Sequence, residues 1–166
     1  MRSAPVSPVY ERLTDMNEVA TRVAEMSLKT VIFDIEPLVA HWNSAQDELD
    51  QGVCSVIRKF AIIPGLRVVC FATNSARQLS AIPQCAGLQV KYLASAGKPL
   101  RTSAYQGFPK PGAVVGDQIL TDGMLARRLD YTFLHCMPSL KGTPLGPRLL
   151  NRFGNLLRPL LFAEDR

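Results

Sequence analysis

The 166-residue sequence lacks the features that mark several specialised classes of protein. No apolar run reaches the length of about 18 residues that a membrane span needs, and the first residues lack the apolar stretch of a secretory signal. The four cysteines form no C-x-x-C pair, and no helix-turn-helix or zinc signature is present. Aromatic residues are few, at 7%, and are not interleaved with basic ones. We therefore expect a cytoplasmic protein with reduced thiols and do not expect a nucleic-acid partner.

What is present is the composition of an ordinary globular domain. Apolar residues make up 47% of the chain and charged residues 20%, and a chain of this length buries roughly two thirds of its unfolded surface without disulfide bonds. The net charge of +5 and a pI near 9.2 favour anionic partners such as phosphate esters or anionic lipid. The sequence carries no signature of a particular oligomeric state.

Short apolar runs rich in β-branched residues alternate with segments of helical periodicity. The predicted strands are residues 29–34, 66–73, 88–95, 113–117 and 131–137. The predicted helices are residues 14–27, 44–60, 76–82, 100–106 and 121–129. Near-continuous apolar strands that alternate with helices are typical of parallel sheets covered on both faces. We therefore expect a Rossmann-like, doubly wound α/β sandwich with a five-stranded, mainly parallel sheet.

The α/β core of this organisation spans residues 29–138, with flanking segments on both sides. Residues 1–28 are expected to be a helical lead-in to the same domain, and residues 139–166 a Gly/Pro-rich connection followed by a basic amphipathic helix. Leucines, Phe153 and three arginines give this last helix an apolar stripe with basic residues between. The stripe either packs against the sheet, which the interruption at Pro159 favours, or contacts an anionic membrane through residues 148–161.

Polar residues stand where four of the predicted strands end. Asp34 ends the first strand, Thr73 ends the second, Lys98 follows the third, and Asp117 ends the fourth, with Asp122 five residues later. In parallel sheets the carboxyl ends of the strands share one edge, where ligands bind near the switch in strand order. Carboxylates are the ligands that Mg²⁺ prefers. The sequence therefore predicts that these side chains converge in one crevice.

Four short motifs carry a family resemblance. They are Phe33-Asp34-Ile35-Glu36, Ala72-Thr73-Asn74-Ser75, Ala96-Gly97-Lys98-Pro99-Leu100 and Val115-Gly116-Asp117-Gln118-Ile119-Leu120-Thr121-Asp122. In order and placing they resemble those of the haloacid dehalogenase-like phosphatases, and most of all the small phosphatases that include phosphatidylglycerophosphate phosphatase. The resemblance runs from about residue 8 to the C-terminal helix.

This resemblance implies a phosphatase that works through an aspartyl-phosphate. Asp34 would be the nucleophile, Glu36 the acid and base, and Lys98 the cation that neutralises the nucleophile and the transferring phosphoryl group. Thr73 and Asn74 would bind the phosphate of the substrate.

The resemblance also implies a magnesium ion. Its ligands would be Asp34, the backbone carbonyl of Glu36, and Asp117, with support from Asp122.

The first motif departs from the family pattern of Asp-x-Asp followed by x-Thr. Glu36 stands in place of the second aspartate, and Pro37 and Leu38 remove a backbone donor and a hydroxyl. Two functions therefore stay open: a phosphatase with an altered acid, or a weakened relative that binds phosphate or Mg²⁺ or serves as an interaction module.

The motifs also lie close together along the chain. Only 38 residues separate Asp34 from Thr73, and 24 separate Thr73 from Lys98. Neither gap leaves room for a cap domain, so we expect an open crevice that could admit a phosphate on a large or lipid-borne substrate.

Overall fold

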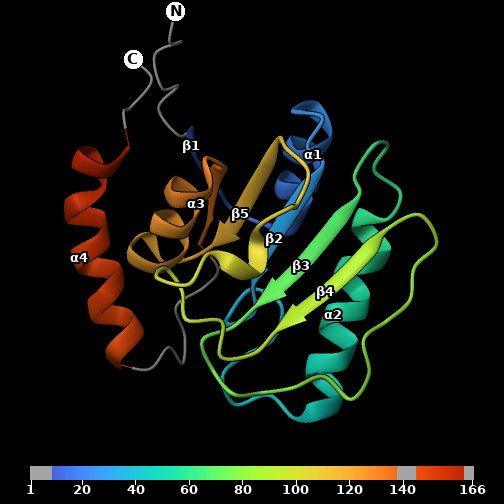
Figure 1. Ribbon diagram of the computed structural model, residues 1–166. Helices are drawn as coiled ribbons and strands as arrows, with labels where there is room; N and C mark the ends of the chain where they lie inside the picture. The colour runs from blue at the N-terminus through green and yellow to red at the C-terminus, as the bar shows by residue number, and fades with distance from the viewer. Residues whose placement is uncertain (1–8, 138–144, 163–166) are drawn as a thin grey trace, which may run out of the picture.

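The computed structural model describes residues 9–137 and 145–162. These residues form one open sheet of six parallel strands, in the order β1-β6-β5-β2-β3-β4 (Figure 1). The strands are β1 (Tyr10–Leu13), β2 (Thr30–Asp34), β3 (Val68–Ala72), β4 (Gln89–Leu93), β5 (Gly112–Gly116) and β6 (Thr132–Cys136). The structure thus confirms an α/β fold and a parallel sheet.

Four α-helices accompany the sheet: α1 (Met16–Glu25), α2 (Gln46–Phe60), α3 (Met124–Leu129) and α4 (Leu145–Leu161). A 3₁₀ turn, η1 (Ser103–Tyr105), precedes β5, and a π-helical turn, η2 (Ile119–Gly123), precedes α3. Helices α1 and α2 cover one face of the sheet, and η1 and α3 cover the other. Two hydrophobic clusters result, one on each face.

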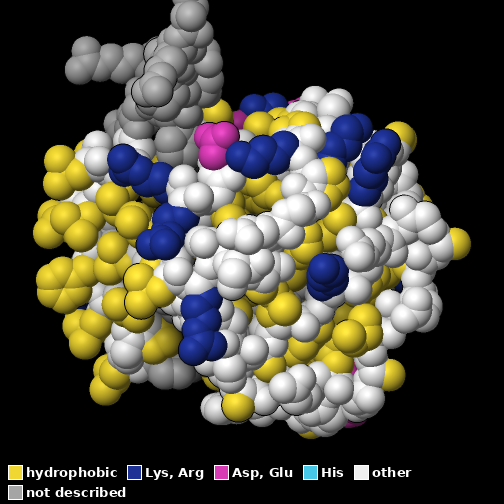
Figure 2. All heavy atoms as spheres, in the orientation of Figure 1, with side chains coloured by type: hydrophobic (Ala, Val, Ile, Leu, Met, Phe, Trp, Pro, Cys, Tyr) yellow, Lys and Arg dark blue, Asp and Glu magenta, His cyan; other side chains and the backbone are white. Residues whose placement is uncertain are grey.

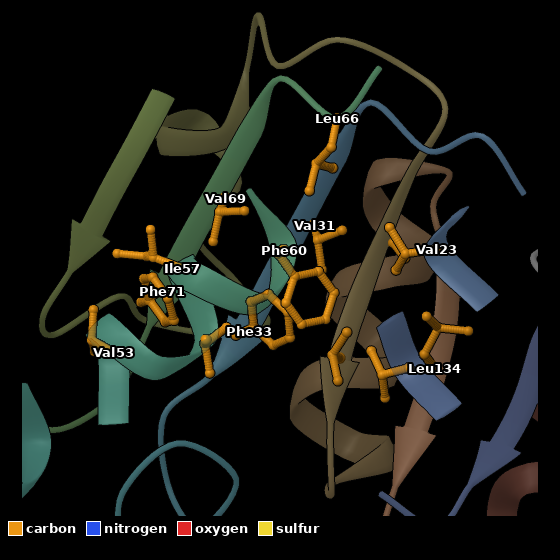
Figure 3. Close-up of a cluster of buried hydrophobic side chains, with 14 of the residues drawn as sticks. Val23, Val31, Phe33, Val53, Ile57, Phe60, Leu66, Val69, Phe71 and Leu134 are labelled. Carbon is orange, nitrogen blue, oxygen red and sulfur yellow. The ribbon is translucent and has the colours of Figure 1, made fainter. Parts of the chain in front are cut away.

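The strands are buried on both faces because their residues alternate between the two clusters. Phe33 of β2 packs on the α1 and α2 side, where its ring meets the edge of Phe60 at 4.8 Å and stacks on Phe71 at 5.7 Å between centroids (Figure 3). Its neighbour Ile32 packs on the opposite side. Both faces of β2 are therefore buried, which explains why its sequence is a nearly continuous apolar run.

The strand order fixes where a ligand site can form. From β2 the chain passes through α2 to β3 and β4 on one side, then crosses through η1 to β5 and β6 on the other. The connections that follow β2 and β5 run in opposite directions, so a crevice opens beyond the carboxyl ends of these two strands. This crevice is the usual ligand position in open α/β sheets. Asp34 and Asp117 lie at these two ends.

The prediction of five strands was wrong, because β1 adds a sixth. It pairs in parallel with β6 at the edge of the sheet and lies in the segment for which only a helical lead-in was expected. Its sequence, Tyr-Glu-Arg-Leu, has little strand propensity, and its residues are half-buried or exposed. The strand is stabilised by its pairing with β6, more than a hundred residues away, and not by the propensity of its own sequence.

The helix predicted at 76–82 is also absent from the structure, and that at 100–106 reduces to η1. In the first segment, side chains from elsewhere take the backbone groups that a helix would have paired. Tyr92 donates its hydroxyl to the carbonyl of Arg77 at 3.0 Å, and the Ser80 N–H donates to Asp50 at 3.1 Å. Tertiary hydrogen bonds therefore override the helical pattern here. The other predicted helices are confirmed as α1, α2 and the η2–α3 segment.

The C-terminal helix does not pack its apolar stripe on the sheet. Helix α4 contacts η2 through Gly154 and Asp117 through Asn151, while Phe153 and the leucines of the stripe other than Leu161 are exposed. Most of the predicted Gly/Pro-rich connection, residues 138–144, lies outside the described residues, and its last three residues begin α4. In the described part of the chain no helix has both the length and the hydropathy of a membrane span.

Candidate metal centre at the carboxyl edge of the sheet

Three carboxylates meet in the crevice between β2 and β5. Asp34 is the last residue of β2, Asp117 follows β5, and the π-helical turn η2 brings Asp122 back beside them. One oxygen of each lies within 4.8 Å of the others, and the three residues are at most 7% exposed. The sheet and the turn thus place three acidic groups in one buried pocket, as the sequence predicted.

Gly116 is what allows Asp122 to reach this position. A Cβ atom at Gly116 would lie 2.3 Å from both the carboxyl carbon and one oxygen of Asp122, which is far inside van der Waals contact. The turn is held by the Asp122 N–H, which donates to the carbonyl of Gln118 at 2.8 Å. A glycine at the end of β5 is therefore a steric requirement of the acidic cluster.

Lys98 joins two of the carboxylates. Its Nζ donates to Asp34 Oδ1 at 2.6 Å and to Asp122 Oδ1 at 2.7 Å. Asn74 fixes the backbone of the lysine, since the Lys98 N–H donates to Asn74 Oδ1 at 2.8 Å and Asn74 Nδ2 donates to the Lys98 carbonyl at 3.1 Å. The residues that follow β3 and β4 are thus tied together, and the ammonium group is delivered to the acids.

Burial and mutual repulsion dominate the electrostatics of the cluster. Burial, with the charge of Asp122 added, raises the pKa of Asp34 well above its ordinary value, although Lys98 opposes this. Burial and Asp122 likewise raise the pKa of Asp117 to about 7. Burial alone would lower the pKa of Lys98, but Asp122 and Asp34 together raise it. The lysine therefore stays charged, while Asp34 and Asp117 resist ionisation.

The cluster has the donors and the charge that a divalent cation needs. With all three acids ionised, Lys98 leaves two negative charges uncompensated in a buried site, and such charges are costly without a counter-charge. Asp117 Oδ1 is buried and has no hydrogen-bond partner among the described residues. Carboxylate oxygens suit hard cations, and Mg²⁺ is usually held by one or two carboxylates with additional waters. These three aspartates could therefore hold a metal ion, and the prediction that Mg²⁺ is the cofactor fits them.

Glu36 lies close by but has different partners. Thr73 donates its hydroxyl to Glu36 Oε2 at 2.7 Å, and an Arg77 nitrogen lies 3.5 Å from Glu36 Oε1. The Thr73 hydroxyl also accepts from the N–H of Ser75 at 3.0 Å. The carboxylate of Glu36 is therefore held on the β3 side of the crevice and is not among the acids of the metal cluster.

All of the predicted catalytic and substrate-binding side chains face one cavity of about 250 Å³. Its lining includes Asp34, Glu36, Thr73, Asn74 and Lys98. Asp117 and Asp122 are not among its lining residues. Asp34 and Lys98 belong both to the lining and to the acidic cluster, so the structure brings the predicted residues together around one cavity.

Several neighbours of the site were not predicted from the sequence. Asn151 of α4 donates to Asp117 Oδ2 at 3.3 Å, and His135 Nε2 lies 3.0 Å from the Asp117 carbonyl. Tyr10 of β1 bonds the other ring nitrogen of His135 at 2.7 Å. Burial lowers the pKa of His135. A polar residue on the side of α4 opposite its apolar stripe was the one signal in the sequence for Asn151.

Trp42 also lines the cavity, from the loop after β2, together with Pro147 and Leu150 at the start of α4.

Comparison with protein-family models, curated proteins and solved structures gives no significant match. What the site does must therefore follow from its own residues.

Proposed function

We propose that the protein is a haloacid dehalogenase-like phosphatase without a cap domain, which hydrolyses a phosphate monoester with Mg²⁺ as cofactor. The observation that carries this proposal is the lysine that bridges two aspartates, with a third aspartate within 4.8 Å, at the switch point of a doubly wound parallel sheet. Counted from β2, five of the strands have the order 3-2-1-4-5 of Rossmann-like sheets, and β1 takes the edge position beside the fifth. Phosphoryl transfer needs this combination of an oxygen nucleophile and fixed positive charge.

Asp34 is the nucleophile in this proposal. It lines the cavity, whereas Asp117 does not, and it ends the central strand β2. Its carboxylate attacks phosphorus, the ester bond breaks, and the alcohol leaves with a proton. Water then cleaves the aspartyl-phosphate and releases inorganic phosphate, so one difficult displacement becomes two easier ones.

Lys98 favours the ionised form of the nucleophile and stabilises the transition state. Its ammonium lies 2.6 Å from Asp34 and is 7% exposed, so its charge acts in a poorly solvated environment. Such preorganised charge is worth far more than a charge in water. Asn74 contributes by fixing the lysine backbone at 2.8 Å rather than by contacting the phosphate.

Asp34, Asp117 and Asp122 would hold Mg²⁺, with the backbone carbonyl of Glu36 as a further ligand of the proposed site. Bound Mg²⁺ would neutralise the phosphate dianion and polarise its oxygens. Asp117 is oriented for this role by Asn151, and its second oxygen has no partner in the described residues.

Glu36 is the group that would protonate the leaving oxygen and later activate water. It lines the same cavity as Asp34, and Thr73 donates a hydrogen bond to it. The same bond uses the Thr73 hydroxyl that would otherwise bind a phosphate oxygen. Turnover therefore requires Thr73 and Glu36 to exchange partners when substrate enters.

The cavity suggests the kind of substrate. About 250 Å³ is below the roughly 300–1,000 Å³ of pockets that enclose a drug-sized ligand, but is sufficient for a phosphate group. The remainder of the substrate would lie outside, which favours a phosphate on a large or lipid-borne molecule such as phosphatidylglycerophosphate.

Phosphate release tests the proposal. Wild-type protein with Mg²⁺ is expected to release phosphate from p-nitrophenyl phosphate or phosphatidylglycerophosphate, whereas Asp34→Asn is expected to be inactive. Asp130→Asn is the matched control, because this carboxylate is exposed and Lys110, at 3.2 Å, is its one ion-pair partner among the described residues. Equal rates for wild type and Asp34→Asn would exclude the mechanism.

One observation favours a second function, a weakened relative that binds phosphate or Mg²⁺ without turnover. Glu36 is engaged by both Thr73 and Arg77 rather than directed at the nucleophile. The variant Glu36→Asp separates the two functions: a large gain in rate means that the longer side chain limits an enzyme. If neither wild type nor Glu36→Asp turns over any phosphate ester while Mg²⁺ still binds, the second function holds.

A further inference from the structure

Helix α4 carries an unusual concentration of exposed apolar side chains. Among the described residues, seven of the ten exposed large hydrophobic side chains belong to it. They are Leu145, Leu149, Leu150, Phe153, Leu156, Leu157 and Leu160, with exposed fractions from 37% to 78%. Isolated exposed leucines are common, but a contiguous patch of this kind marks an interaction surface. Figure 2 shows hydrophobic side chains gathered over this helix at the left edge of the molecule, with basic side chains beside them.

The helix is divided into three sectors. At about 100° per residue, the exposed apolar side chains fall within an arc of about 140°, which we call the apolar sector. Asn151, Gly154 and Phe162 form the buried sector on the opposite side. Arg148 and Arg152 are exposed between the two, along one border of the apolar sector.

The buried sector holds α4 firmly in this orientation. Gly154 lies against η2, where an added Cβ atom would be 3.0 Å from the Ile119 side chain. Phe162 stacks with Phe133 at 5.7 Å between centroids. Arg127 of α3 donates to the carbonyl of Leu161 at 3.0 Å and so caps the end of the helix. Rotating α4 to bury its apolar sector would break these contacts.

The charge of α4 indicates what covers the apolar sector. Residues 145–161 include no Asp or Glu, and two of their arginines, Arg148 and Arg152, border the apolar sector, whereas Arg158 lies over the Tyr10 ring on the buried side. Pairing of two copies of this face would bring the arginines together without an acidic partner, which opposes self-association. An anionic lipid surface satisfies both properties, because apolar side chains enter the acyl boundary and arginines contact the headgroups.

We propose that α4 is an interfacial membrane-binding helix, which docks the protein on anionic bilayers through its apolar sector and its arginine border. The helix would lie in the plane of the membrane. Its 17 residues span about 26 Å, shorter than the hydrocarbon core of about 30 Å, and its buried sector must stay on the protein.

Docking would also orient the candidate site. Leu150 belongs to the apolar sector and lines the 250 Å³ cavity, together with Pro147. The mouth of the cavity would therefore lie next to the lipid surface. The consequence that phosphate groups on lipids reach Asp34 rests on the function proposed above, whereas docking itself does not.

Cosedimentation with vesicles tests the docking. Wild-type protein is expected to bind vesicles of phosphatidylcholine mixed with phosphatidylglycerol, and to bind vesicles of phosphatidylcholine alone at least tenfold more weakly. Phe153→Ser combined with Leu156→Ser should abolish binding, because both side chains are more than half exposed and contribute little to folding. Ile62→Ser combined with Leu100→Ser is the matched control, since these side chains are 81% and 74% exposed elsewhere on the protein.

Charge reversal tests the arginine border. Arg148→Glu with Arg152→Glu should weaken binding to anionic vesicles at least tenfold, whereas Arg58→Glu with Arg67→Glu, which makes the same charge change elsewhere, should not. If both pairs weaken binding equally, net charge alone is responsible and the proposal is wrong. The proposal is also wrong if the wild-type protein does not bind anionic vesicles.

Light scattering of wild type and of the Phe153→Ser, Leu156→Ser variant tests whether a second copy of the protein, rather than lipid, covers the apolar sector. A wild-type dimer that becomes monomeric in the variant, without vesicle binding, would make this face a contact between copies and overturn the proposal. Phosphate release from p-nitrophenyl phosphate without lipid should be the same in both proteins. A wild-type protein that releases phosphate but does not bind anionic vesicles would overturn the docking alone, and one that binds these vesicles but releases no phosphate would overturn the proposed function alone.

Discussion

Replacing Asp117 by Asn should stabilise the metal-free protein at alkaline pH. Asp117 is 2% exposed, and burial and Asp122 raise its pKa to about 7 in the folded protein, against about 3.9 in an unfolded chain. The proton therefore leaves the unfolded state first as the pH rises. Between about pH 4 and pH 7 the folded state binds more protons than the unfolded state, so the free energy of unfolding falls over this range and levels off above it.

The size of the effect follows from the two pKa values. The difference between the folded and unfolded pKa values lowers the free energy of unfolding by about 4 kcal/mol at pH 8 and by about 1.5 kcal/mol at pH 5. Asparagine has nearly the same shape and no charge, and its amide could donate to Asn151 Oδ1, which has no partner among the described residues. Since a buried amide has its own desolvation cost, we expect about half of the electrostatic gain, roughly 2 kcal/mol. That corresponds to a rise in Tm of roughly 4–8 °C for a chain of this size.

Thermal unfolding in the presence of a chelator, at pH 5 and pH 8, measures this difference. Added Mg²⁺ should reverse the ranking, because wild type gains about 2.7 kcal/mol at a hundredfold excess over Kd and the variant loses a ligand. Asp130→Asn serves as the control, since its carboxylate is exposed and its left-handed backbone (φ 57°) suits asparagine. A lower Tm for Asp117→Asn than for wild type at pH 8 in chelator would refute the electrostatic reasoning.

Two further substitutions test the cluster from other sides. Gly116→Ala places a Cβ atom 2.3 Å from Asp122 and should abolish the Mg²⁺-dependent rise in Tm. Gly146→Ala is the control and should keep this rise, because a Cβ atom there meets nothing within 4 Å. An undiminished rise in Gly116→Ala would contradict the proposed ligand set. Lys98→Met leaves Asp34 and Asp122 as unpaired buried acids and should lower the free energy of unfolding at pH 7 by about 3–5 kcal/mol, measured by urea denaturation; an unchanged urea midpoint would show that the lysine contributes no net stabilisation.

The interior strands could be predicted from the sequence because their signal is local. A strand buried on both faces must be apolar throughout, and Val31-Ile32-Phe33 and Ala113-Val114-Val115 meet this condition without help from the rest of the chain. The acids at the strand ends followed for the same reason. Once β2 and β5 are parallel strands, Asp34 and Asp117 share an edge whatever the loops do.

The parts that could not be predicted depend on contacts between distant residues. Strand β1 exists because Tyr10–Leu13 pairs with β6, and its Tyr10 hydroxyl reaches His135. The segment after β3 is not a helix because Asp50 and Tyr92 bind its backbone. None of these partners is visible in a local window of sequence.

The apolar stripe of α4 shows a different kind of ambiguity. Amphipathic periodicity indicates a helix with one apolar face, but it does not say what that face contacts. Burial on the sheet was the alternative that Pro159 favoured, yet the structure buries the opposite side. Gly154 permits the close approach to Ile119, and Asn151 reaches Asp117. Asn151, Gly154 and the buried Phe162 just after the helix determined its orientation, and the large apolar residues of the exposed sector did not.

The same residues that weaken the fold of the metal-free protein give the site its chemistry. A core selected for stability alone would not bury three carboxylates around one lysine, because replacing such a group by apolar residues is often neutral or stabilising. Nor would it leave Asp117 Oδ1 without a hydrogen-bond partner in the described part of the chain. Local conflict of this kind, in a chain whose strands otherwise agree with their environment, is characteristic of a functional site. The acidic cluster therefore supports the proposed metal site rather than a role in folding.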